Sequence, residues 1–289
     1  MVVLFHDVSA ATAAGLFSVS NLLQGRVDVW CRCVTAALYL SDDLRRDTVV
    51  SLVLSPPSSE EKLEKEFPTH IGRTRVVTVR GDEVEGLAPA ETRVALLLQR
   101  ATQHASLGAL GELGREAKRN TAARAANRDE NAEEETKSSN EKKSERNASR
   151  RRARWVAQRP GSAFGPVPGI TVTDYLNLET CLNAVVFERH ALGSRGPGSI
   201  LLLDAAGAPF AGAEALGKEK RADLSATTTT TFVLGDATGI TKIERELLMR
   251  RDGISTVALG PRVLLASHCI VLAHAALDNV DDVECYAKE

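Results

Sequence analysis

The sequence has few cysteines, and their arrangement suggests neither a disulfide framework nor a metal site. The five cysteines are scattered, odd in number and include no C-x-x-C pair, which is typical of a reducing compartment. No Lys or Arg occurs in the first 25 residues, so the basic region of a secretory signal and the Arg-rich pattern of a mitochondrial presequence are both missing. No apolar run approaches the roughly 18 residues of a membrane span. We therefore expect a soluble protein of the cytoplasm.

The chain has 289 residues, of which 43% are apolar and 26% are charged, so it can bury a sizeable core in one or two domains. Its charge is unevenly distributed. The segment 115–154 holds 13 Lys or Arg residues against 8 Asp or Glu residues, whereas the whole chain has a formal net charge of -2. If the partner is a nucleic acid, the attraction must come from this segment or from local patches on an otherwise acidic body.

The segment 115–154 contains almost no large apolar residue, so it buries too little surface to offset the entropy cost of ordering. We expect a disordered, charged insertion that interrupts a single domain formed by the rest of residues 1–289. Its "RRRAR" run fits a nucleic-acid contact, a nuclear signal or a solvated linker. The sequence leaves these three interpretations open, and with them the nucleus as a second compartment.

Short apolar runs alternate with segments of helical spacing along the rest of the chain. Runs typical of buried strands are "MVVLFHDV", "TVVSLVLS", "RVVTVRG", "SILLLDAAG", "TFVLGDATG" and "ISTVALGP". Helices are expected in "WCRCVTAALYL", "APAETRVALLLQRATQHA", "KIERELLMR" and "LASHCIVLAHAALD", and after a short extended piece in "PGITVTDYLNLETCLNAVVFE". This alternation predicts an α/β fold with a mainly parallel sheet flanked by helices.

Ligands of such sheets bind beyond the carboxyl ends of the strands. Four loops are expected at that edge: the one after the first strand, which ends in "GRVD", and the turns "DAAG", "GDATG" and "LGPRVL". Their glycines let the backbone approach a ligand closely and leave N–H and C=O groups free to bind it. Ordinary strand-to-helix turns have the same composition, so the glycines alone do not establish a binding site.

The stretches "RVDVWCRCVTAALYLSDDLRRD", "PGITV", "FVLGDATGI" and "ALGPRVLLASHCIVLAHAALD" resemble the TrmY family, the tRNA (pseudouridine(54)-N1)-methyltransferases of the SPOUT superfamily. The resemblance covers roughly residues 1–112 and 165–285 in the family's order. Three features depart from the family's pattern: the charged insertion, the polar "ATTTTT" run and a longer approach to "ALGP".

This resemblance implies a deep trefoil knot in the C-terminal part, a homodimer, tRNA as the substrate and S-adenosylmethionine as the methyl donor. The same chemistry on ribosomal RNA, and a knotted RNA-binding assembly factor without turnover, remain alternatives. Carried over by position, the resemblance implies that the cofactor pocket is lined by Leu203, Gly235, Leu259, Gly260, Pro261, Arg262, Val263, Leu264 and Cys269.

Cys31 and Cys33 lie in a segment of helical spacing. Side chains two residues apart on a helix point about 200° from each other, so these thiols neither share a metal ion nor form a strain-free disulfide. The segment is apolar on nearly all sides, which predicts a buried helix with both thiols in the core. The histidines show no metal-ligand spacing either, and we expect no metal and no membrane partner.

Two charged clusters flank this predicted helix. Arg26 and Asp28 lie between the first strand and the helix, hence at the carboxyl edge of the sheet, whereas Arg45, Arg46 and Asp47 lie at the opposite edge. We therefore take Arg26 and Asp28 as the candidate catalytic residues, although helix capping and a local ion pair would explain them without catalysis. For the other three residues we expect a structural role or a subunit contact.

Deletion of residues 115–154 separates the interpretations of the charged insertion. If the insertion contacts phosphates, the variant should bind RNA more weakly, and its affinity should depend less steeply on salt concentration, because fewer counterions are released. Binding titrations at several salt concentrations measure both quantities. An unchanged slope would show that the segment is a linker.

Overall fold

The structure, a computed structural model, describes residues 1–57, 74–106, 166–190, 199–210, 229–260 and 262–282. The chain divides into one unit formed by Met1–Thr102 and Val167–Glu289 and a second formed by Gln103–Pro166. The first unit carries the sheet and every side chain discussed below. The predicted insertion at 115–154 lies outside the described residues.

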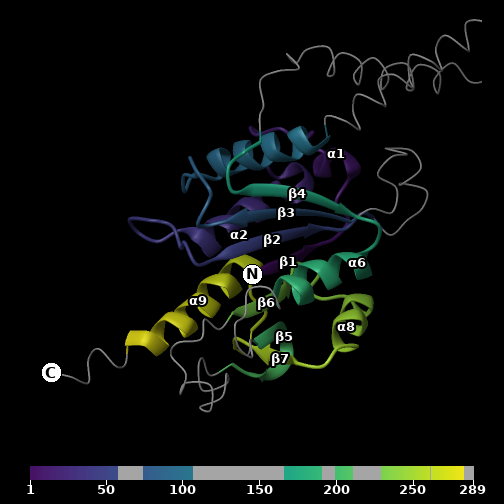
Figure 1. The fold of residues 1–289 in the computed structure, drawn as a ribbon, viewed down its shortest axis with the longest axis vertical. Helices are drawn as coiled ribbons and strands as arrows, with labels where there is room; N and C mark the ends of the chain where they lie inside the picture. Colours follow the sequence, from purple (N-terminus) through teal and green to yellow (C-terminus); the bar gives the residue numbers. More distant parts are fainter. Residues whose placement is uncertain (58–73, 107–165, 191–198, 211–228, 261, 283–289) are drawn as a thin grey trace, which may run out of the picture. The chain divides into compact units, whose positions relative to one another are not determined.

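Seven strands form one sheet in the order β4, β3, β2, β1, β6, β5, β7 (Figure 1). The neighbours of β1 and of β5 all run parallel to them, whereas β3 runs antiparallel to both of its neighbours. The prediction of a mainly parallel sheet is therefore confirmed. The strands are β1 Val2–Phe5, β2 Val49–Leu54, β3 Thr74–Arg80, β4 Ile170–Tyr175, β5 Ser199–Pro209, β6 Thr230–Gly235 and β7 Ile254–Ala258.

Helices cover both faces of the sheet. One face is packed by α2 Val27–Leu38, α9 Ala266–Asp282 and residues 91–102 of the helix that begins at residue 91. The other face is packed by α6 Leu178–Leu182, the π-helical segment η3 Asn183–Glu188 and α8 Lys242–Met249. Two short helices, α1 Ala10–Ala13 and η1 Gln24–Arg26, lie in the β1–α2 connection. None of the helices among the described residues is long and apolar enough to cross a lipid bilayer.

Alternation along β1 sends successive side chains to the two faces of the sheet. Val3 and Phe5 belong to the apolar cluster that includes α2 and α9, whereas Val2 and Leu4 belong to the cluster that includes α6 and α8. Both faces of this central strand are thus buried, as is usual for parallel strands. The same alternation directs His6, the next residue along the chain, toward α8.

The helix α2 is buried on most of its circumference. Trp30, Cys31 and Cys33 are 0% exposed, and the Trp30 ring packs against the rings of Phe5 and Phe17. Burial raises the pKa of both thiols to about 12, which keeps them protonated at neutral pH. The prediction of a buried helix with its cysteines in the core is therefore confirmed.

The turn predicted at "DAAG" is wrong, because β5 continues through these residues to Pro209. Gly207 lies so close to β7 that an added Cβ would be 2.6 Å from the backbone of Val257. Leu203 and Ala208 both pair with Val257, so the residues between them form a bulge, which absorbs extra residues without ending the strand. The glycine serves a close approach of two strands and not a strand-to-helix turn.

Candidate functional site

The β1–α2 connection contains the two non-glycine residues with positive φ in the described part of the chain, Asp7 at 51° and Arg26 at 57°. This left-handed conformation is unfavourable for residues with a Cβ, and such strain is concentrated at functional sites. Gly25 precedes Arg26 with a φ of 78°, and an added Cβ there would lie 2.6 Å from Oγ1 of Thr12. The turn that presents Arg26 is thus held tightly against α1.

The two candidate catalytic residues lie on either side of the start of α2. Arg26 is exposed, whereas Asp28 in the first turn is only 7% exposed. Oδ2 of Asp28 is paired with the guanidinium of Arg32 one turn further on. Oδ1 of Asp28 is buried and has no hydrogen-bond partner within the described ranges. An unpaired buried acceptor costs about 1–3 kcal/mol, so its presence calls for an explanation, and a role in catalysis supplies one.

The charged residues before β2 form contacts within the chain. Nη1 of Arg45 donates to Oδ1 of Asp278 in α9 over 2.9 Å, and Nη2 of Arg46 lies 3.0 Å from Oδ1 of Asp43. Asp47 accepts a hydrogen bond from the hydroxyl of the next residue. These contacts agree with the structural role expected from the position of these residues at the opposite edge of the sheet.

Several residues that the family resemblance assigns to the cofactor lie at the ends of β6 and β7 and at the bulge in β5, the strand between them. Leu203 pairs with Val257 of β7, Gly235 is the last residue of β6, and Leu259 directly follows β7. Leu203 and Leu259 pack in the same apolar cluster as Cys269 of α9. These three implied cofactor residues thus belong to the apolar cluster on the face of the sheet that α2 and α9 cover.

The loop between β7 and α9 holds the other implied cofactor residues. Gly260 has a φ of 155°, and the position that a Cβ would take there is open space. Arg262 is exposed, Val263 is 89% exposed and Leu264 is partly buried. Pro261 lies outside the described residues. Arg262 and Val263 are therefore the implied cofactor residues that a single chain leaves in solvent.

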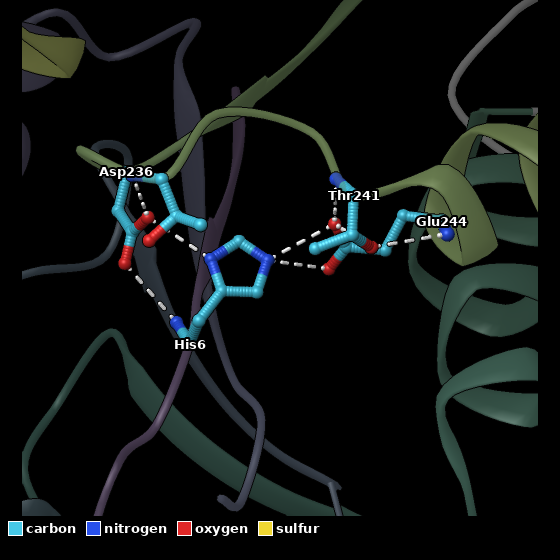
Figure 2. A network of polar contacts seen from close by, with 5 residues as sticks. His6, Asp236, Thr241 and Glu244 are labelled. Atoms are coloured by element: carbon cyan, nitrogen blue, oxygen red, sulfur yellow. Dashed lines mark hydrogen bonds and ion pairs between the residues drawn. The ribbon is translucent and has the colours of Figure 1, made fainter. Parts of the chain in front are cut away.

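The sequence did not predict a polar cluster at the same edge of the sheet, formed by His6, Asp236 and Glu244 (Figure 2). Nδ1 of His6 lies 2.9 Å from Oδ1 of Asp236, and Nε2 lies 2.9 Å from Oε1 of Glu244. The backbone N–H of His6 also donates to Oδ2 of Asp236 over 3.1 Å. A single imidazole thus joins the end of β1 to both ends of the β6–α8 connection.

The electrostatics of the cluster favour a protonated imidazole between two carboxylates. Hydrogen bonds to Asp236 and Glu244 raise the pKa of His6 to about 10, against the opposing effect of burial. Burial by itself would raise the pKa of both carboxyl groups, but the hydrogen bonds from His6 and from nearby backbone N–H groups lower both values. At neutral pH the cluster therefore carries one positive and two negative charges.

Glu244 also caps α8. Its Oε2 accepts hydrogen bonds from the N–H and the hydroxyl of Thr241, each over 2.8 Å. The "TKIE" pattern is a recognisable capping box, but no local pattern connects Glu244 with His6, which lies 238 residues away. Within the described residues, no group of three or more His, Cys, Asp or Glu side chains could hold a metal ion.

Comparison with known proteins identifies the family. A model of the family described as SAM-dependent RNA methyltransferase matches residues 8–129 and 216–281, and the chain belongs to this family. Two curated relatives are both named tRNA (pseudouridine(54)-N(1))-methyltransferase. The protein from Methanococcus vannielii is 25% identical over 257 residues, which cover 89% of this chain and 86% of the relative. The protein from Methanococcoides burtonii is 25% identical over 271 residues, which cover 93% and 92%.

Among solved structures, the chain is similar to Nep1 of Archaeoglobus fulgidus, which was crystallised bound to S-adenosylhomocysteine. The similarity covers 97% of each chain at 11% identity, with a TM-score of 0.43.

His6→Gln should lower the free energy of unfolding by about 3 kcal/mol near pH 6, because it leaves the buried Glu244 without its cation. The pKa of His6 is raised on folding from 6.5 to about 10. The stabilisation is therefore complete below pH 6.5 and is lost as the pH rises toward 10. The difference between the two proteins should shrink over this range, and urea denaturation at a series of pH values measures it.

His268→Gln is the matched control, since His268 is exposed near the start of α9. We expect it to leave the free energy of unfolding nearly unchanged at every pH. A destabilisation by His6→Gln that is equally large at pH 6 and pH 10 would show that His6 is not a cation in the folded protein.

Proposed function

We propose that this protein transfers the methyl group of S-adenosylmethionine to N1 of pseudouridine 54 in the T-loop of tRNA. Membership of the family supports SAM-dependent RNA methylation, and two relatives that match over most of their length are named for this reaction. The observation that carries the proposal is the position of Arg26 and Asp28 between β1 and α2, at the edge of the sheet where Gly235 ends the neighbouring strand β6.

The residues at this edge fit the proposed methyl donor. Leu203, Leu259 and Cys269 offer apolar side chains to the adenosyl group, and the open space at Gly260 allows close approach of a ligand to the backbone. The His6 cluster has a net negative charge beside Gly235, which favours a cation such as a sulfonium at this edge. When bound, S-adenosylmethionine supplies an electrophilic methyl group.

The candidate catalytic residues have distinct tasks in this proposal. N1 of pseudouridine carries a proton that must leave as the nitrogen attacks, and Asp28 accepts it through Oδ1, the oxygen that no donor occupies in the described part of the chain. Arg26 is exposed and binds a phosphate or a carbonyl oxygen of the substrate. Holding N1 in line with the methyl group supplies most of the rate enhancement.

The proposal extends to the architecture and setting of the enzyme. It includes a trefoil knot in the C-terminal part, a homodimer, a single domain interrupted by the charged segment 115–154, and residence in the cytoplasm. A group of exposed apolar side chains around the start of α9 supports a subunit contact there. The group consists of Val263, Leu265, Val271 and Leu272.

A methylation assay with the purified protein tests the function. A tRNA that carries pseudouridine at position 54 should gain a methyl group at N1, whereas the same tRNA with uridine should not, because N1 of uridine is bonded to the ribose. Mass spectrometry of the digested nucleosides identifies the product, and calorimetry measures binding of S-adenosylmethionine. Methylation of ribosomal RNA alone would overturn the substrate, and absence of cofactor binding would favour an assembly factor without turnover.

Asp28→Asn should lower kcat by about 10²-fold to 10⁴-fold, the usual effect of losing a general base, and should retain binding of S-adenosylmethionine. Asp43→Asn is the matched control, because it removes a carboxylate that pairs with Arg46 at the opposite edge of the sheet. Circular dichroism establishes that both variants are folded. Undiminished turnover by Asp28→Asn would exclude Asp28 as the base.

A further inference from the structure

Two acidic residues directly follow implied cofactor residues at the bulge in β5 and at the end of β6. Asp204 follows Leu203, and Asp236 follows Gly235. Each carboxylate is held by a cation from elsewhere in the chain: Asp204 pairs with Arg245 of α8, and Asp236 pairs with His6. The two strands are neighbours in the sheet, so both ion pairs act on the same part of its edge.

The two ion pairs meet at the start of α8. Arg245 and Glu244 are consecutive residues of this helix, and Glu244 is bound by Nε2 of His6. Asp204 is therefore linked to α8 by its ion pair with Arg245. The preceding residue, Glu244, is linked by His6 to Asp236. Because β6 lies between β1 and β5, the five side chains extend from the ends of β1 and β6 to the bulge in β5. We call them the strand-end network.

The loop that follows Gly235 is fixed by the same contacts. The N–H of Asp236 donates to the carbonyl oxygen of Leu4 over 2.9 Å, and Oδ1 of Asp236 accepts the N–H of Thr238 over 2.8 Å. At Gly235 an added Cβ would lie 2.1 Å from the carbonyl oxygen of Gly239. The strand end and its loop are thus packed backbone to backbone, and His6 holds them to β1.

The need to neutralise a buried carboxylate explains the contact between His6 and Glu244 but not the ion pair between Arg245 and Asp204. Glu244 is 1% exposed and needs a cation for stability. The side chain of Arg245, however, is 38% exposed, and an ion pair at such a position contributes little to stability. What this pair does fix is the position of Asp204 at the start of the bulge in β5, one residue beyond Leu203.

We propose that the strand-end network is a positioning device that sets the spacing between Leu203, at the bulge in β5, and Gly235, at the end of β6, and thereby the affinity for S-adenosylmethionine. The proposal rests on the proposed function, which assigns these two residues to the cofactor. The five side chains act through Leu203, Gly235 and the loop that follows Gly235. They are positioning residues and do not touch the reacting atoms.

An exchange of charges between Asp204 and Arg245 tests the proposal. Asp204→Arg and Arg245→Asp each place two like charges together, and each should weaken binding of S-adenosylmethionine by about tenfold. The KM for S-adenosylmethionine should rise accordingly, with little change of kcat at saturation. The double variant restores the pair in reverse and should recover most of the affinity. Recovery is a readout that a general loss of stability does not produce.

Arg250→Glu is the matched control on the same helix. Arg250 pairs with Glu179 over 3.5 Å, and both side chains are exposed, so this reversal should leave the affinity for S-adenosylmethionine unchanged. Calorimetry measures the affinity of each variant at a temperature where circular dichroism shows it to be folded.

The outcomes separate this proposal from the proposed function. A wild-type protein that does not bind S-adenosylmethionine would overturn the proposed function itself. A wild-type protein that binds it, with the same affinity in both single variants, would overturn the positioning role alone. A loss of affinity in the single variants that the double variant does not recover would also overturn it.

Discussion

A carboxylate buried at the start of a helix needs a positive charge beside it. The polar contacts at the carboxyl edge of the sheet supply that charge. Glu244 is 1% exposed, and the positive charge that it needs comes from His6 at the end of the central strand. Because His6 continues the alternation of Val2 and Leu4, the packing of β1 fixes where the imidazole lies. The apolar core and the polar cluster are therefore parts of a single arrangement.

The elements of the fold were predictable because their signals are local. A strand buried on both faces is a short apolar run, and a helix buried on most sides, such as α2 with Cys31 and Cys33, is apolar all round. The end of β5 was not predictable, since Gly207 looks the same in a turn and beside the backbone of Val257. A glycine in the sequence is compatible both with a turn and with the close approach of another backbone, and the sequence does not show which of the two is present.

The site was predictable only as far as chain order determines it. The position of Arg26 and Asp28 between β1 and α2 places them at the carboxyl edge, and their catalytic roles remain predictions. The His6 cluster depends on β1 and β6 lying side by side, which no spacing in the sequence indicates. The implied cofactor residues follow from a family resemblance, and three of them, Leu203, Leu259 and Cys269, pack in one apolar cluster.

The neighbourhood of β1 and β6 also has a consequence for synthesis. Val2 lies opposite Val233, and a ribosome adds roughly 5–20 residues per second. The ribosome therefore needs on the order of ten seconds or more after making β1 to reach β6. During that time the backbone hydrogen-bonding groups on this edge of β1 lack their strand partner. The other edge can pair with β2 much earlier. The carboxyl edge shared by β1 and β6 therefore forms only after residues 230–235 have been synthesised.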